Sequence, residues 1–265
     1  MNQFAADAPI LMIDSVFGGL TMYDAVRARL PDAPIIYAAD LAGLPYGTKS
    51  EAEVAARVCG LLGRMSERYA PRLAVIACNT ASTIALSMVR DVLEIPIVGT
   101  VPAIKPAAAA TQTGMIGVLG TAATIRQPYV DELEAQFASG KTLLRHAAPE
   151  LVLLGEAKLR GEAINSDMVR AAVEGMRARS EGRMDIVVLA CTHFPLLHDE
   201  LGEVFGSGVT LVDGADGIGR RVEALVAGQT IARAPSRVVA TGSPEALVPY
   251  AAALASRGFA TTATF

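Results

Sequence analysis

Short apolar runs recur along the chain and alternate with segments in which apolar residues have helical spacing. Apolar runs of about four to eight residues, bounded by polar or turn residues, are typical of buried strands. Such runs predict strands at 10–13, 35–38, 73–77 and 97–99, and again at 115–119, 143–145, 186–190 and 209–212. Helices are expected between them, for example over 50–69, 81–92 and 166–179. This alternation predicts parallel sheets built from βαβ units, and therefore an α/β fold.

The two sets of strands have similar spacing, which indicates an internal duplication. The duplication predicts two pseudo-symmetric domains, each a parallel-sheet βαβ sandwich. The chain is expected to enter the second domain near Thr100 and to leave it near Asp213, so the predicted domains are 1–100 with 214–265, and 101–213. A further strand at 237–241 and a helix at 244–256 are expected to complete the first domain. Because ligands bind at the carboxyl ends of strands in open α/β sheets, we expect the active site in the cleft between the domains.

Each half of the chain has a cysteine at the end of an apolar run, Cys78 after 73–77 and Cys191 after 186–190. A cysteine is most often a small buried hydrophobe, and that interpretation is kept for Cys59, which lies inside a helical segment. Two cysteines at equivalent strand ends favour chemistry instead. Both precede expected helix starts, a position that lowers the pKa of a thiol. One thiolate and one thiol can remove a proton from one face of a carbon and return one to the other, which inverts a stereocentre.

Polar residues beside these cysteines are candidates for proton transfer and substrate binding. His193 could exchange a proton with Cys191 because its pKa is near neutrality, although a histidine at a turn is often only solvated. Asp14, which ends the first strand, is the candidate partner of Cys78, with a helix N-cap as the alternative. Tyr46 and Gly47 lie in a turn-rich segment that could line the substrate. Short side chains at strand ends or helix starts are candidate carboxylate ligands, although each alone could be a helix cap: Ser15, Asn79, Thr80, Thr121, Thr124 and Thr192.

Composition excludes several classes of protein. Three cysteines are too few for a disulfide framework, and the N-terminus lacks the pattern of a secretion signal, so we expect a cytoplasmic protein. No apolar stretch approaches the ~20 residues of a membrane span. The net charge of −4 does not indicate the basic surface that binds nucleic acid. There is no CxxC motif, no GxGxxG after the first strand and no Walker A sequence, so we expect neither a metal nor another cofactor.

Taken together, the motifs resemble those of the glutamate racemases, within the aspartate/glutamate racemase superfamily. The resemblance extends over nearly the whole chain. Its matching segments are Asp14-Ser15 with Gly18-Gly19-Leu20, Pro45-Tyr46-Gly47 with Lys49-Ser50, Cys78-Asn79-Thr80-Ala81-Ser82, Gly120-Thr121 with Thr124-Ile125, Cys191-Thr192-His193 with Pro195-Leu196-Leu197, and Asp213.

The resemblance implies a cofactor-independent enzyme that interconverts L- and D-glutamate by two-base proton transfer. It implies that Cys78, assisted by Asp14, deprotonates the D enantiomer, and that Cys191, assisted by His193, deprotonates the L enantiomer. The family also has a glutamate that supports the histidine; the best match is Glu156, with an exposed helical carboxylate as the alternative. The product would be D-glutamate for peptidoglycan, and so for cell-wall biogenesis and cell shape. We expect a homodimer whose partner is a small molecule, glutamate.

Two segments depart from the family pattern. Val16-Phe17 replaces the usual Gly-Val, and 148–154 replaces a segment that usually reads Cys-Pro-Leu-Phe-Val-Pro-Leu, adding the charged Glu150. These departures bear on substrate identity, regulation and subunit packing more than on the reaction type. The alternatives are a racemase of aspartate or another acidic substrate, and a non-catalytic protein that binds a small ligand. A decarboxylase-like relative would need only one cysteine.

Overall fold

The computed structural model describes residues 4–265, which form two compact units. The first unit comprises the chain up to Thr100 together with Ala215–Phe265, and the second comprises Val101–Gly214. The chain therefore leaves the second unit one residue later than the expected boundary. Each unit is built around its own parallel sheet, and each is described by itself.

The sheet of the first unit has six parallel strands in the order β10-β9-β2-β1-β3-β4. Their bounds are β1 Ile10–Asp14, β2 Ile35–Ala39, β3 Leu73–Ile76, β4 Ile97–Gly99, β9 Arg237–Ala240 and β10 Thr261–Thr264. Strands β1, β2 and β3 are buried along their whole length, as expected for apolar runs at the centre of a parallel sheet. The four strands predicted for this half are therefore present.

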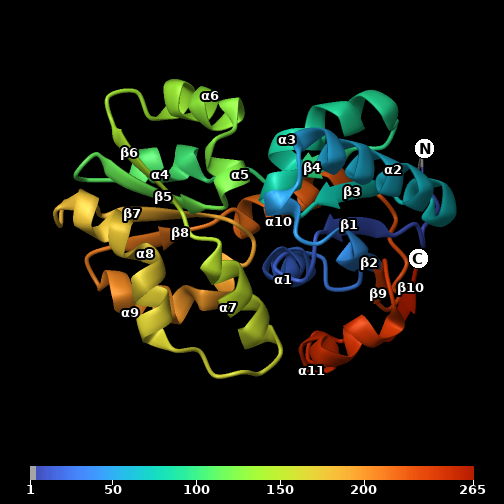
Figure 1. The fold of residues 1–265 in the computed structure, drawn as a ribbon. Helices are drawn as coiled ribbons and strands as arrows, with labels where there is room; N and C mark the ends of the chain where they lie inside the picture. Colours follow the sequence, from blue (N-terminus) through green and yellow to red (C-terminus); the bar gives the residue numbers. More distant parts are fainter. Residues whose placement is uncertain (1–3) are drawn as a thin grey trace. The chain divides into compact units, whose positions relative to one another are not determined.

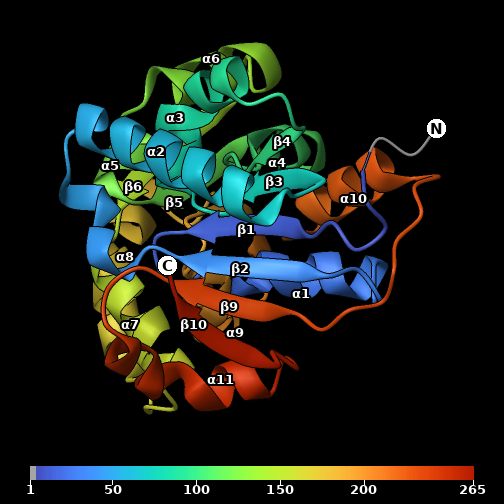
Figure 2. The same cartoon turned by 90° about the vertical axis from the view of Figure 1, so that its right-hand side faces the viewer.

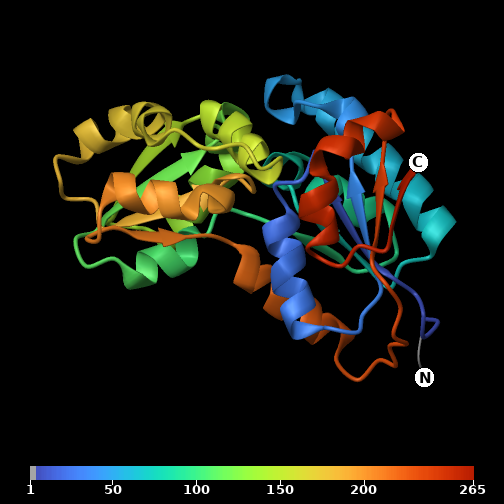
Figure 3. The same ribbon diagram turned by 90° about the horizontal axis from the view of Figure 1, so that it is seen from below.

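Helices pack against this sheet and against each other. The α-helices of the first unit are α1 Leu20–Arg29, α2 Glu51–Tyr69, α3 Asn79–Val92, α10 Ala215–Val226 and α11 Ala251–Ala255; the 3-10 helices are η1 Leu41–Gly43, η2 Tyr46–Thr48 and η4 Pro244–Tyr250. Helix α2 begins with a capping box between Ser50 and Glu53, and its apolar face packs with α3 on one side of the sheet (Figure 2). Helices α1 and α10 lie against one another (Figure 3).

The second unit has four parallel strands in the order β6-β5-β7-β8. These strands are β5 Met115–Gly120, β6 Thr142–Ala147, β7 Ile186–Ala190 and β8 Thr210–Val212. The helices are α4 Ile104–Ala110, α5 Ala122–Ile125, α6 Pro128–Phe137, α7 Glu150–Leu159, α8 Ser166–Ser180, η3 Phe194–Leu197 and α9 His198–Phe205. Figure 1 shows α4 and α6 on one side of the sheet and α7, α8 and α9 on the other, and a hydrophobic core lies on each side.

The two sheets share one topology. In both, the first strand lies between the second and the third, and the fourth follows: β2-β1-β3-β4 in one unit and β6-β5-β7-β8 in the other. This shared order confirms the predicted fold class, an α/β protein with two related parallel sheets. The first sheet alone is extended, by β9 and β10 beyond β2.

The C-terminal segment differs from its prediction in two ways. The helix expected over 244–256 is instead the 3-10 helix η4 followed by the short α11. Pro249 lies inside this segment and lacks the N–H that a continuous α-helix requires. Strand β10 was not predicted; it is exposed along its length, so it lacks the apolar signature of a buried strand. Within residues 4–265, no helix is both long and apolar enough to cross a membrane.

Candidate active site

The strand register of the first unit brings Asp14 and Cys78 to the same edge of the sheet. Ile13 pairs with Ile76 on the neighbouring strand; Asp14 follows Ile13 directly, and Cys78 lies two residues after Ile76. Both are buried: Asp14 is 1% exposed and Cys78 is 6% exposed. Sequence positions 64 residues apart thus become neighbours because both strands are parallel and end together.

Hydrogen bonds hold the Asp14 carboxylate on both of its oxygens. Oδ1 accepts from the Ser15 backbone N–H at 2.7 Å and from the Ser15 hydroxyl at 3.4 Å. Oδ2 accepts from the Gly19 N–H at 2.6 Å and from the Tyr37 hydroxyl at 3.1 Å. The Cys78 thiol lies 3.9 Å from the Ser15 hydroxyl. Cys78, Ser15 and Asp14 therefore form a hydrogen-bonded chain, and Gly19, not Asp14, holds the N-cap position of α1.

Helix α3 begins immediately after Cys78. Cys78 is the N-cap residue and Asn79 and Thr80 are the first two helical residues, all three being buried. The N-cap side chain makes no capping hydrogen bond, so the positive end of the helix dipole is presented beside the thiol. Asn79 Oδ1 is buried and has no hydrogen-bond partner among residues 4–265. A buried amide oxygen without a partner is costly, and this atom is suited to receive a hydrogen bond from a bound ligand.

Tyr46 and Gly47 lie in the 3-10 turn η2. Tyr46 is 3% exposed, whereas Gly47 is half-buried. Burial, the hydrogen bond from Tyr46 to Asp40 and the nearby Asp40 charge all raise the pKa of the Tyr46 hydroxyl, and a charge on Cys78 raises it further. Tyr46 and Cys78 belong to the same buried core cluster, which places the tyrosine ring in the neighbourhood of the thiol. The first unit therefore brings together Asp14, Ser15, Tyr46, Cys78, Asn79 and Thr80.

In the second unit, a thiol, an imidazole and a carboxylate form a buried chain. Cys191 follows the end of β7, and its sulfur lies 3.7 Å from His193 Nδ1. His193 Nε2 lies 2.7 Å from Glu156 Oε1 on α7. Cys191, His193 and Glu156 are each less than 10% exposed. The alternatives of a solvated histidine and an exposed helical carboxylate are therefore wrong.

The pKa of His193 is raised well above its ordinary value. Burial alone lowers it, but the hydrogen bonds to Cys191 and Glu156 and the charges of these two groups raise it by more. Helix α7 can approach His193 because residue 155 is glycine: a Cβ there would lie 3.0 Å from the His193 carbonyl oxygen and 3.2 Å from its Cβ. The geometry and the raised pKa favour a protonated His193.

The remaining candidates of the second unit lie at the same sheet edge. Gly120 pairs with Ala190, so Thr121 and Cys191 follow neighbouring strand ends. Thr121 caps the four-residue helix α5 by accepting from the Thr124 N–H, and the two hydroxyls lie 3.0 Å apart. Thr192 is buried beside Cys191.

The α-helix expected to start after Cys191 is absent. The chain there forms the 3-10 helix η3, Phe194–Leu197, and α9 begins only at His198. Pro195 lies in the first turn of η3, and four residues of 3-10 helix separate the cysteine from α9. The prediction that Cys191 directly precedes an α-helix was therefore wrong, and the titratable group beside its sulfur is the imidazole of His193.

Of the two segments that depart from the family pattern, the first is buried and the second is partly exposed. Phe17 is fully buried and stacks with Tyr37 at 5.9 Å and packs on Tyr250 at 4.6 Å, measured between ring centroids. Val16 accepts a hydrogen bond from the Tyr37 hydroxyl through its carbonyl. In the second departure, Glu150 is exposed in the first turn of α7, where a negative charge complements the helix dipole.

Two buried residues that hydrogen-bond to candidate site residues were not singled out from the sequence: Tyr37, which bonds to Asp14, and Asp40, which bonds to Tyr46. Asp40 directly follows β2, the same position relative to its strand that identified the two cysteines, so its sequence carried a usable signal. Tyr37 lies within the apolar run of β2 and carried none. All three cysteines are free thiols, with Cys59 packed against the core. The described part of the chain contains no group of three or more His, Cys, Asp or Glu side chains suited to a metal ion.

Comparison with known proteins identifies close relatives. The family model described as Asp/Glu/Hydantoin racemase matches residues 19–218. Glutamate racemase from Sphingopyxis alaskensis is 58% identical over 267 residues, covering 100% of both chains. Among solved structures, Escherichia coli glutamate racemase in complex with L-glutamate and the activator UDP-MurNAc-Ala has a TM-score of 0.90 at 38% identity, covering 97% of this chain and 98% of that one. Glutamate racemase isoform RacE1 from Bacillus anthracis has a TM-score of 0.82 at 26% identity, covering 98% and 97%.

Proposed function

Because the chain belongs to the Asp/Glu/Hydantoin racemase family, we propose that it interconverts L- and D-glutamate by transfer of the α-proton between two cysteines. The resemblance to the glutamate racemases and the expected class of enzyme, an amino-acid racemase, are confirmed by these relatives. The substrate, the roles of the two thiols and the independence from cofactors are the proposal.

One observation carries the mechanism. In each unit a buried thiol follows a central parallel strand and is connected by hydrogen bonds to a buried carboxylate: Cys78 through Ser15 to Asp14, and Cys191 through His193 to Glu156. Two independent systems that can each hold or release a proton are what a racemase needs and what a single-base enzyme would not need.

The proposed reaction begins with Cys78 as thiolate and Cys191 as thiol. The Cys78 thiolate takes the α-proton of D-glutamate, and the C–H electron pair moves into the α-carboxylate, giving a planar carbanion. Cys191 then delivers its own proton to the opposite face, which gives L-glutamate. The enzyme is left with Cys78 protonated and Cys191 ionised, the form that accepts the L enantiomer. The mechanism requires the two sulfurs to meet the α-carbon from opposite faces.

The residues around each thiol have distinct proposed roles. A protonated His193, held by Glu156, stabilises the Cys191 thiolate, which is consistent with its raised pKa. Asp14 acts on the Cys78 side through the Ser15 hydroxyl. Both thiols are almost completely shielded from water, and in such surroundings charge-directed hydrogen bonds are stronger than in solvent.

We propose that neutral donors bind the substrate carboxylates. The proposed carboxylate ligands are the backbone N–H groups at the start of α3 and the hydroxyls of Ser15, Thr80, Thr121 and Thr192. Thr124 supports Thr121, and the turn of Tyr46 and Gly47 lines the substrate. The unpartnered Oδ1 of Asn79 is suited to accept from the substrate α-ammonium group. Neutral donors need not stabilise the ground state as strongly as an ion pair and can strengthen as charge moves into the α-carboxylate.

The test is solvent exchange in deuterium oxide combined with cysteine variants. Wild-type protein should exchange the α-hydrogen of both glutamate enantiomers and convert each into the other, and aspartate and other acidic amino acids in the same panel should react more slowly. Cys78→Ser and Cys191→Ser should each abolish racemisation because a neutral alcohol is a far poorer base than a thiolate. Cys59→Ser is the matched control and should racemise normally. Normal racemisation by either active-site variant would refute the mechanism, and faster exchange of another amino acid would reassign the substrate.

We further propose that the product is D-glutamate for peptidoglycan, and that the protein acts in the cytoplasm as a homodimer. A strain that lacks the gene should grow only when D-glutamate is supplied. Light scattering of the purified protein should give twice the chain mass of 27.6 kDa. Growth without D-glutamate, or a mass of one chain, would refute the corresponding part.

A further inference from the structure

A buried carboxylate lies beneath the turn that carries Tyr46. Asp40 directly follows β2 and is 1% exposed. Its oxygens accept hydrogen bonds from side chains of three separate segments. Arg57 on α2 donates from Nε and, at 2.6 Å, from Nη2; the Tyr46 hydroxyl donates at 2.7 Å; and the Thr241 hydroxyl, after β9, also donates. Such a set of donors fixes the positions of all three segments relative to Asp40.

Charge and burial act together in this cluster. Burial alone raises the pKa of Asp40, but Arg57 and the hydroxyls of Thr241 and Tyr46 lower it by more, so that the pKa of Asp40 is lowered overall. The hydrogen bond from Arg57 to Asp40 outweighs burial and raises the pKa of Arg57. Burial and Asp40 also raise the pKa of Tyr46. The ion pair therefore stays charged near neutral pH, and Tyr46 remains a fixed hydrogen-bond donor.

Backbone hydrogen bonds connect Asp40 to the main chain of Asp14, the candidate catalytic residue. The Asp40 N–H donates to the Asp14 carbonyl at 2.9 Å, and the Asp40 carbonyl accepts from the Gly43 N–H at 3.0 Å. Thr241 donates its N–H to Ala39, and its hydroxyl accepts from the Ala42 N–H, both at 3.0 Å. Asp40 thus connects the end of the strand carrying Asp14, the η1 and η2 turns, and the segment after β9.

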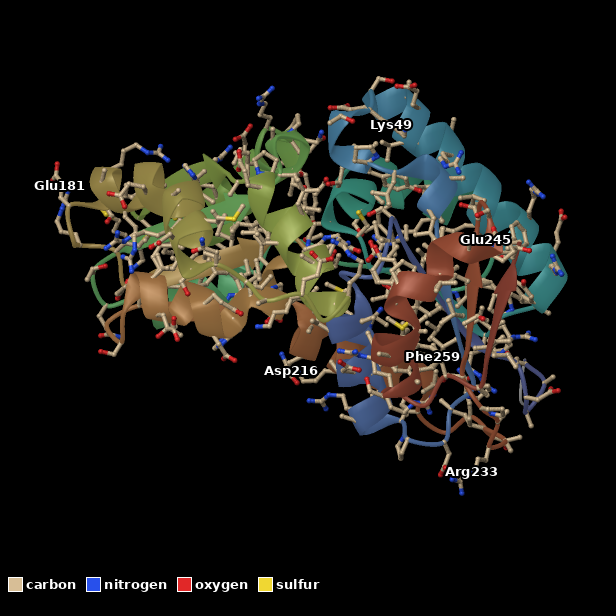
Figure 4. All side chains as sticks on the ribbon, turned by 60° about the horizontal axis from the view of Figure 1, so that its bottom comes forward. Lys49, Glu181, Asp216, Arg233, Glu245 and Phe259 are labelled. Carbon is tan, nitrogen blue, oxygen red and sulfur yellow. The ribbon has the colours of Figure 1, made fainter. Side chains whose placement is uncertain are left out.

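Gly43 shows how closely the turn is packed on this ion pair. A Cβ at residue 43 would overlap the Asp40 carboxylate and the Arg57 guanidinium. Only glycine leaves room for both groups at this point of the chain. Lys49, labelled in Figure 4, marks the place where the turn leads into α2, the helix that carries Arg57. The ion pair between Asp40 and Arg57 therefore connects the two ends of a segment that contains both 3-10 turns and the start of α2.

We propose that Asp40, together with Arg57 and Thr241, is a positioning group that holds the Tyr46–Gly47 turn against Cys78 and so shapes the substrate-facing surface around that thiol. Its contacts run to Tyr46 on one side and to the Asp14 backbone on the other, whereas no hydrogen bond joins it to Cys78 itself among those described above. Its role in the reaction rests on the proposed racemase function; its role in shielding Cys78 does not.

The experiment compares Asp40→Asn and Gly43→Ala with Gly60→Ala. Gly60 lies on α2 with nothing within 4 Å of an added Cβ, so it is a matched control for Gly43. Iodoacetamide alkylation of each cysteine is followed by peptide mass spectrometry, and Cys191, in the other unit, is the internal reference. Losing a charge-directed hydrogen bond should loosen the turn and expose Cys78 more often. The rate of Cys78 alkylation should therefore rise about tenfold. Cys191 alkylation should not change, and the KM for both glutamate enantiomers should rise by about the same factor.

A second set of variants keeps the proposal testable if Asp40→Asn does not fold. Thr241→Val removes one donor while leaving the ion pair with Arg57, and it should give the same selective rise in Cys78 alkylation at smaller amplitude. If Asp40 acts through the turn, combining Asp40→Asn with Tyr46→Phe should be no worse than Asp40→Asn alone.

Three results would overturn the proposal. Unchanged Cys78 alkylation in Asp40→Asn and Gly43→Ala would show that the cluster does not hold the turn over the thiol. Faster alkylation of Cys78 and Cys191 in proportion to a lower Tm would show a general loss of stability instead. Selective alkylation of Cys78 with wild-type KM and kcat would show that the turn shields the thiol without serving the reaction. If the wild type does not racemise glutamate, the proposed function fails, and the alkylation results still decide whether Asp40 positions the turn.

Discussion

Replacing Glu156 with glutamine should lower the pKa of His193 and slow racemisation. Glu156 Oε1 lies 2.7 Å from His193 Nε2, and both residues are less than 10% exposed. Glutamine keeps the size of the side chain and one hydrogen bond but removes the charge. A hydrogen bond to a charged group contributes ~1.5–3 kcal/mol, and one pKa unit corresponds to ~1.36 kcal/mol. The pKa of His193 should therefore fall, because one of the charges that raises it is removed, and kcat/KM should fall about 10- to 100-fold.

The same pair predicts how stability depends on pH. Because the pKa of His193 is raised in the folded protein, the pair contributes its full stability below about pH 6.5, the ordinary histidine value, and loses it as the pH rises through the folded-state pKa. Glu156→Gln should therefore be less stable than the wild type by ~1.5–3 kcal/mol at pH 6, and the difference should shrink in alkaline solution.

Nuclear magnetic resonance of histidine ring nitrogens measures the shift directly. The chain has three histidines, so His146 and His198 supply reference signals that should not move. Urea unfolding at several pH values gives the stability difference. Glu200→Gln is the matched control because it removes a carboxylate that pairs with Lys158 at 2.8 Å in the same unit. An unchanged His193 titration in Glu156→Gln, or a stability difference independent of pH, would refute the reasoning.

Three other predictions address the same site. Gly155→Ala should push α7 away from the His193 backbone, because an added Cβ would lie 3.0 Å from the His193 carbonyl oxygen, and should lower kcat/KM about tenfold. The control Gly202→Ala in α9, where an added Cβ meets nothing within 4 Å, should have wild-type kinetics. Equal kinetics of the two variants would contradict the packing argument. Asn79→Leu and Thr192→Val should each lower kcat/KM about tenfold in both directions with unchanged circular dichroism; wild-type kinetics in both would mean that the substrate is held elsewhere. Activity should survive dialysis, chelators and carbonyl-trapping reagents; activity lost on dialysis and restored by pyridoxal phosphate or a divalent ion would show that a cofactor is needed.

Those parts of the fold that depend on local apolar patterning could be predicted from the sequence. Strands β1, β3, β5 and β7 are fully buried and, apart from Asp14 at the end of β1, contain no polar side chain, so their positions and the residues at their ends were predictable. Because parallel strands end at one edge, this was enough to bring Asp14 and Cys78 to one edge and Thr121 and Cys191 to another. The residues of the candidate site could thus be identified as the polar residues at the ends of buried strands.

What could not be predicted depends on contacts distant in sequence. Asp40 meets Thr241 across 201 residues, and no local pattern relates the two. Strand β10 is exposed and polar, and it is defined by its pairing with β9 rather than by burial. The 3-10 helix after Cys191 was not predicted because Pro-Leu-Leu has the composition of an α-helix start. An α-helix and a 3-10 helix differ in their backbone hydrogen bonds, and the pattern of side chains says little about these bonds.

The order of the strands also has a consequence for how the chain is made. Strand β2 pairs with β1 on one side and with β9 on the other, and β9 lies about 140 residues beyond the end of the first half of its sheet. From β2, which ends at Ala39, to β9, which begins at Arg237, the chain runs for about 200 residues. On a ribosome that adds ~5–20 residues per second, the second edge of β2 therefore stays unpaired for roughly 10–40 s. Residues 101–214 are continuous in sequence and need not wait. In nascent chains paused before β9, the second unit should therefore be folded, while the unpaired edge of β2 in the first unit should be available to bind chaperones.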